Sequence, residues 1–146
     1  MSGRLLMSLF LGFTVLFGIA LYYFQTFAFY ERKTDIVSLQ VAGETVLVRN
    51  YEGIDASTSP LKLRGCFKAD PLLFSAAEPA PDAVPLTAPA WFSCFDAGSL
   101  TESLLSGEAS AYRVRSDDPE GFDLMVAVYP DGRGFIWRQL GPEFAE

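Results

Sequence analysis

Two cysteines, Cys66 and Cys94, are the residues whose type and spacing most clearly predict chemistry in this chain. A single pair of cysteines in a small exported domain is typical of a disulfide, and we expect one here. Two buried free thiols in a cytosolic domain are the alternative that the sequence leaves open. The cysteines are too far apart for a Cys-x-x-Cys redox or metal motif, so we expect no copper or zinc site.

Catalytic side chains are sparse. The chain has no histidine, which removes the commonest general base and the commonest transition-metal ligand. No glycine-rich phosphate loop precedes a helix, and no nucleophile elbow is present. We therefore expect no catalytic residue, no metal and no cofactor. An enzyme that used carboxylates alone would need a deep pocket holding two carboxyl groups of raised pKa.

Two polar turns are candidate sites. The first is an acidic cluster of Asp117, Asp118, Glu120 and Asp123. Its spacing is not that of an EF-hand loop, so we interpret it as a solvated turn rather than a weak calcium site. The second consists of Asp131, Gly132, Arg133 and Gly134. Its composition predicts a hairpin turn, and it is also a candidate interaction loop.

The longest apolar segment must position everything that follows it. Residues 5–30 contain no charged side chain, and as a helix they would be roughly 39 Å long, enough to cross a hydrocarbon core of about 30 Å. The apolar run exceeds the ~7–15 residues of a signal-peptide core, so we predict an uncleaved transmembrane helix. A cleaved signal peptide and a buried soluble helix are the alternatives.

Small and hydroxyl side chains in this segment suggest contact with another helix. Gly12, Gly18 and Ala20 would allow close backbone approach, and Ser8 and Thr14 can form hydrogen bonds between helices. Glycine is also common in membrane helices without such a role. We expect residues 1–4 in the cytoplasm and residues 31–146 in the periplasm, because a cysteine pair favours an oxidising compartment. The Lys and Arg count slightly favours the reverse orientation, a weak rule for long domains.

Residues 31–146 predict a small α+β domain with a mostly antiparallel sheet and one short helix. Alternating patterns predict a hairpin of residues 36–41 and 45–49, and a strand at residues 61–67. Residues 51–60 are predicted to be a loop, and the proline-rich residues 71–89 an irregular excursion. A capping box of Ser99 and Glu102 predicts the start of a helix that ends at Gly107.

The last strands are predicted at residues 109–115, 122–129 and 135–140. Four aromatic residues are expected in the core rather than in a ligand site: Trp91, Phe92, Phe95 and Trp137. All 18 Asp and Glu residues follow Tyr30, and the formal net charge of the chain is −7. A nucleic-acid binder would show a basic face, so no nucleic-acid partner is expected.

Four segments of the chain, residues 53–60, 64–67, 86–96 and 129–134, together resemble an uncharacterised family of single-pass membrane proteins from alphaproteobacteria. The resemblance covers nearly the whole chain and supplies no activity or catalytic residue. It implies a bacterial inner membrane, and hence a periplasm in which a disulfide could form.

Three classes of function follow. We expect a non-catalytic accessory or assembly subunit of an inner-membrane protein complex, such as a respiratory or photosynthetic one. Its partners would be that integral membrane complex and the lipid around the anchor. A free-standing, membrane-tethered binding module for a periplasmic protein or small ligand is the alternative. An enzyme that uses carboxylates alone is the third class and the least favoured.

Overall fold

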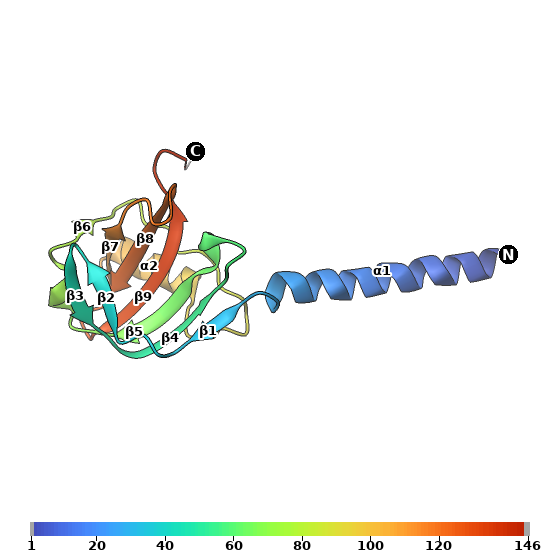
Figure 1. Ribbon diagram of the computed structural model, residues 1–146, viewed down its shortest axis with the longest axis horizontal. Helices are drawn as coiled ribbons and strands as arrows, with labels where there is room; N and C mark the ends of the chain where they lie inside the picture. The colour runs from blue at the N-terminus through green and yellow to red at the C-terminus, as the bar shows by residue number, and fades with distance from the viewer. Residues whose placement is uncertain (1, 145–146) are drawn as a thin grey trace.

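The N-terminal apolar segment forms one helix that projects away from a β domain (Figure 1). In the computed structural model, which describes residues 2–144, helix α1 spans Gly3–Thr26 and none of its residues is buried. The Ser2 hydroxyl caps it by accepting from the Leu5 N–H at 3.4 Å. The helix thus begins and ends earlier than residues 5–30, and the chain continues directly into strand β1 (Glu31–Lys33).

Seven strands form one antiparallel sheet in the order β1-β4-β5-β9-β8-β7-β6. Besides β1, its strands are β4 (Arg49–Asp55), β5 (Arg64–Lys68), β6 (Glu78–Pro79), β7 (Ser110–Arg115), β8 (Phe122–Val128) and β9 (Arg133–Leu140). The longest ladder joins β9 to β8. Strand β8 is buried along most of its length, and β9 at every residue except Arg133, Phe135, Arg138 and Leu140.

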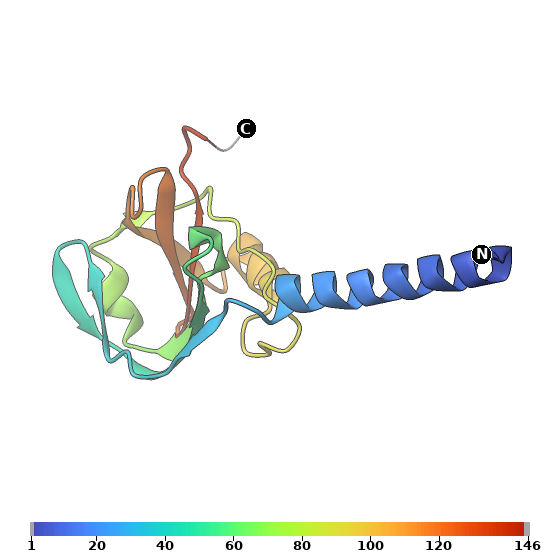
Figure 2. The same cartoon turned by 45° about the vertical axis from the view of Figure 1, so that its right-hand side comes forward.

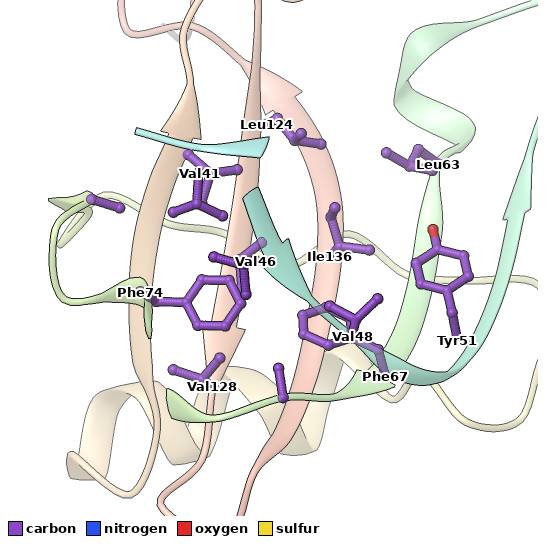
Figure 3. Packing of buried hydrophobic residues seen from close by; sticks show 14 residues of the cluster. Val41, Val46, Val48, Tyr51, Leu63, Phe67, Phe74, Leu124, Val128 and Ile136 are labelled. Carbon is purple, nitrogen blue, oxygen red and sulfur yellow. The ribbon is translucent and has the colours of Figure 1, made fainter. Parts of the chain in front are cut away.

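A separate hairpin covers one face of this sheet (Figures 1 and 2). It pairs β2 (Ser38–Val41) with β3 (Glu44–Leu47). Its turn residues Ala42 and Gly43 both have positive φ, 52° and 83°, as a two-residue type I′ turn requires. Figure 3 shows Val41 and Val46 of the hairpin facing Phe74 and the sheet residue Val128. The predicted hairpin is confirmed.

Helix α2 (Ala97–Ser106) lies on the opposite side of the sheet from the hairpin (Figure 2). Leu100 anchors it in a second core that contains Met125 and Trp137. Phe92, Phe95 and Trp137 are buried as predicted, whereas Trp91 is half-buried at the edge of this core. The predicted fold, a mostly antiparallel β domain with one short helix after an apolar helix, is confirmed.

Three local predictions are wrong. Residues 51–55 are not a loop, because they lie in β4. Residues 61–63 are not strand, because Pro60–Lys62 form a 3₁₀ turn, η1, and β5 begins at Arg64. Helix α2 begins before Ser99, because Asp96 is its N-cap and accepts from the Ser99 N–H at 3.1 Å. The irregular excursion holds two short elements, η2 (Pro71–Phe74) and β6.

Glycine in the strands makes room for aromatic rings. A Cβ added to Gly134 of β9 would lie 2.3 Å from the Phe67 ring. That ring is itself 3% exposed and packs between the rings of Tyr51 and Phe74. It has no space to withdraw, so we expect position 134 to tolerate no side chain.

We predict that Gly134→Ala lowers the free energy of unfolding by about 1–3 kcal/mol, the usual cost of overpacking a core. Denaturant unfolding of the full chain in detergent measures it. Gly98→Ala is the matched control: it adds the same methyl group at an exposed position in α2, where its nearest neighbour would be Asp96 Oδ1 at 3.4 Å. Because alanine favours helix, this control should be neutral or stabilising. Equal stability of both variants would contradict the packing argument.

Candidate functional site

The two cysteines form the disulfide that the sequence predicts. Cys66 of β5 is bonded to Cys94, with the two Cα atoms 6.3 Å apart. The bridge fixes the segment that enters α2 to the middle of the sheet, since β5 lies between β4 and β9. The chain between the cysteines includes the whole proline-rich excursion, so this bond is one of its anchors.

The junction between α1 and the domain is built around Trp91. Its indole Nε1 donates to the backbone carbonyl of Thr26, the last residue of α1, at 2.6 Å. The carbonyls in the last turn of a helix have no partner within the helix, so the domain satisfies one of them. The Trp91 ring also stacks on Phe27 at 5.9 Å and meets Tyr30 edge-on at 5.7 Å. These contacts define the direction in which α1 leaves the domain.

Two cations lie on the aromatic rings of this junction. The Arg32 guanidinium is 4.9 Å from the centre of the Trp91 ring, and the Lys62 ammonium is 5.1 Å from that of Tyr30. A surface hollow of about 340 Å³ is lined by Phe27, Tyr30, Arg32 and Trp91. The junction therefore combines rings, positive charge and open space at one end of α1.

A buried arginine holds the excursion against the sheet. Arg64 is 6% exposed. Its Nε donates to the carbonyl of Leu86 at 2.9 Å and its Nη2 to that of Thr87 at 3.3 Å. Its Nη1 donates to the carbonyls of Leu63, at 2.6 Å, and Leu61. Burial lowers the pKa of Arg64 to about 10, partly opposed by a neighbouring tyrosine hydroxyl, so the group stays charged at neutral pH.

The acidic cluster is not a solvated turn throughout, because one of its carboxylates is buried against an arginine. Asp123 is 3% exposed, and its Oδ2 accepts from Arg113 Nε at 2.7 Å. Arg113 also bonds Asp82 Oδ2 at 2.7 Å and lies 3.6 Å from Glu78 Oε1. Burial lowers the pKa of Arg113, but the hydrogen bonds and charges of Asp123 and Asp82 outweigh it and raise that pKa. Asp123 is thus the buried member of the cluster, paired with Arg113.

Within residues 2–144, no group of three or more His, Cys, Asp or Glu side chains is arranged to hold a metal ion. Of the remaining cluster members, Asp118 Oδ2 accepts from Arg115 Nη1 at 2.6 Å. Asp117 Oδ1 accepts from the Gly121 N–H at 3.2 Å. Both carboxylates therefore shape the turn between β7 and β8.

The turn at residues 131–134 is divided between two environments. Asp131 and Arg133 are exposed and bonded to each other at 2.9 Å, and the Arg133 guanidinium lies 4.1 Å from the Tyr129 ring centre. Gly132 and Gly134 are buried. A docking surface at this turn would therefore consist of Asp131 and Arg133, which already contact their neighbours.

The small residues of α1 do not form a single stripe. At about 100° per residue, Gly18 lies roughly 120° around the helix from Gly12, and Ala20 lies on neither face. No heavy atom outside the helix backbone comes within 4 Å of a Cβ placed on either glycine. Thr14 Oγ1 donates to the Phe10 carbonyl at 2.9 Å. The hydroxyl hydrogen of Thr14 is therefore already bonded within the helix. A partner helix could use either glycine face, but not both.

Sequence reasoning missed the two arginines and the junction. Arg64 and Arg113 were each expected on strands, with no partner in view. Trp91 was assigned to the core. One signal was present: Trp91 follows a proline-rich segment and precedes the predicted helix, so it has little regular structure of its own to pack against. Nothing in the sequence identifies the end of α1 as its partner.

Residues 35–144 match the sequence model of a family described as a family of unknown function (DUF6446). The match begins after α1 and β1, so it covers most of the β domain and none of the apolar helix. No curated protein and no solved structure matches the chain.

We predict that reducing the Cys66–Cys94 bond lowers the free energy of unfolding by about 3–4 kcal/mol, the chain-entropy value for a loop of this length. Denaturant unfolding with and without a reductant measures the effect. The double variant Cys66→Ser/Cys94→Ser is the control, because its unfolding should not respond to the reductant. A wild-type midpoint that does not move on complete reduction would show that the bond contributes nothing.

Proposed function

The chain belongs to the DUF6446 family, and we propose that it is a membrane-anchored, non-catalytic accessory or assembly subunit of a protein complex in a bacterial inner membrane. In this proposal α1 crosses the membrane and the β domain stands in the periplasm. The complex would be of a respiratory or photosynthetic kind. The disulfide supports an oxidising compartment.

Anchoring is supported by the length and surface of α1. Within residues 2–144, α1 alone is long and apolar enough to cross a membrane, and at about 36 Å it exceeds a hydrocarbon core of about 30 Å. Cleavage as a signal sequence would remove two partners of Trp91, because Thr26 and Phe27 would leave with the helix. An uncleaved anchor keeps these contacts.

One observation carries the accessory role: the domain is fixed to the end of its helix through Trp91. A domain that needs only to stay near a membrane can hang on a flexible linker. Hydrogen bonding and stacking across the junction instead give the domain one orientation. A fixed orientation is useful when a surface must meet a second membrane protein at a defined height and angle.

The alternative is a membrane-tethered module that binds a small ligand. The observation in its favour is a cavity of about 160 Å³. The residues that line it include Tyr51, Leu63, Leu124, Ile136 and Arg138. Ligand pockets usually measure about 300–1,000 Å³, so this cavity is small for the purpose. The hollows that reach this range, of about 340–370 Å³, are lined mainly by exposed or half-buried residues. We therefore favour the accessory role.

We predict that full-length chain extracted in mild detergent migrates as part of a larger assembly, and that Trp91→Ala reduces the amount of co-purified partner several-fold. Trp91→Phe keeps the stacking on Phe27 but loses the hydrogen bond to Thr26. The amount of partner that it co-purifies should therefore lie between those of wild type and Trp91→Ala. Hydrogen exchange at residues 27–30 should accelerate in the same order. Wild type that migrates only as the free chain would contradict the accessory role.

We further predict that one of Gly12→Leu and Gly18→Leu reduces partner association while the other does not, because the two glycines face different directions. Both should insert normally, since leucine is favourable in the bilayer. Each variant is the control for the other, at equal membrane levels by immunoblot. If neither variant weakens association, and an unrelated anchor of equal length also leaves it unchanged, then α1 is only a tether and the domain performs the recognition.

A further inference from the structure

The junction of α1 with the domain is also a concentration of positive charge in an acidic chain. The formal net charge is −7, yet Arg32 and Lys62 lie on the Trp91 and Tyr30 rings at this place. Two cations therefore lie on two aromatic rings that contact each other.

These cations are not neutralised by the domain. None of the ion pairs within residues 2–144 includes Arg32, Lys62 or Arg64. By contrast, Lys33 lies 3.8 Å from Glu31, and the guanidinium groups of Arg113 and Arg115 bond carboxylates directly. Arg64 is held by carbonyl oxygens alone. The junction can therefore accept an anion from outside the chain.

The position of the hollow indicates which anion. It is lined by Phe27, Tyr30, Arg32 and Trp91, and Phe27 directly follows the last residue of α1. If α1 crosses the bilayer, these residues lie at the depth of the lipid headgroups, where tryptophan and tyrosine are favoured. Phosphate groups are the anions of that layer, and an arginine can bind a phosphate through two parallel hydrogen bonds.

We propose that the hollow beside Trp91 binds the headgroup of an anionic phospholipid, with Arg32 as the phosphate ligand and Lys62 as a second cation. Phe27 and Trp91 supply apolar walls for the adjoining part of the lipid. This inference rests on the proposed anchoring by α1. It adds a specific lipid to the contacts that fix the orientation of the domain.

The test uses full-length chain in nanodiscs that contain equal amounts of phosphatidylglycerol and phosphatidylcholine. Native mass spectrometry after release into neutral detergent counts the lipid retained by each chain. Wild type should retain phosphatidylglycerol in preference to phosphatidylcholine. Arg32→Gln should weaken this retention roughly fivefold, as expected for one cation at an anionic surface. Lys62→Gln should add a further loss when the two are combined.

Two cations serve as matched controls. Lys33 is on the same short strand as Arg32 but is paired with Glu31. Arg133, the first residue of β9, lies on the ring of Tyr129. Lys33→Gln and Arg133→Gln should both leave retention unchanged. If either control variant lowered retention as much as Arg32→Gln, the effect would be one of total charge, and the proposed site would be rejected.

The remaining outcomes separate this inference from the proposed function. Failure of wild type to incorporate into nanodiscs would refute anchoring itself. Normal incorporation with equal retention of the two lipids would refute the headgroup site and leave the anchor intact. Displacement of bound phosphatidylglycerol by excess inorganic phosphate would show that the hollow takes soluble anions, and would also overturn the lipid assignment.

Discussion

The segment between β6 and α2 does not pair its backbone carbonyls within regular structure. Side chains of the sheet donate hydrogen bonds to them instead, and the rest of the structure depends on these bonds. Proline-rich chain lacks many of the N–H groups that regular structure would use, and buried carbonyls without partners are costly. Arg64 donates from β5 to the carbonyls of Leu86 and Thr87. Arg64 is thus the attachment of this segment to the sheet at residues 86–87.

Other groups attach the same segment at further points. Gln139 accepts from the Val84 N–H at 2.8 Å and donates to the Asp82 carbonyl at 3.3 Å, and Arg113 bonds the Asp82 carboxylate. The disulfide then fixes Cys94. Trp91 lies between these attachments, so its ring is presented to α1 from a rigid support. Hydrogen bonds between side chains of the sheet and this segment thus support the Trp91 ring, and the ring in turn sets the orientation of the domain relative to α1.

The sequence predicts the regular parts of this fold because their signals are local. Alternating residues and a turn that needs positive φ define the β2–β3 hairpin, and a lone cysteine pair defines the disulfide. Strand β4 escapes prediction because Gly53 resembles a turn signal. In the structure a Cβ at Gly53 would lie 2.6 Å from the Tyr51 ring, so this glycine serves packing. Arg64 escapes because alternation from Lys62 suggests a surface face, and the 3₁₀ turn at residues 60–62 breaks that alternation. The packing of the Tyr51 ring over Gly53 and the bonds of Arg64 to Leu86 and Thr87 are properties of the folded chain that neither pattern indicates.

The two outer strands of the sheet have a consequence for chains crowded at one surface. At one edge β6 has only two residues, and Pro79 has no N–H to offer a neighbouring strand. At the other edge β1 is three residues long, and all of them are charged. Short, charged and proline-containing edges resist pairing with another strand. If α1 anchors the chain, copies confined to a membrane plane would meet far more often than copies free in solution, and these edges would then oppose assembly into continuous sheets.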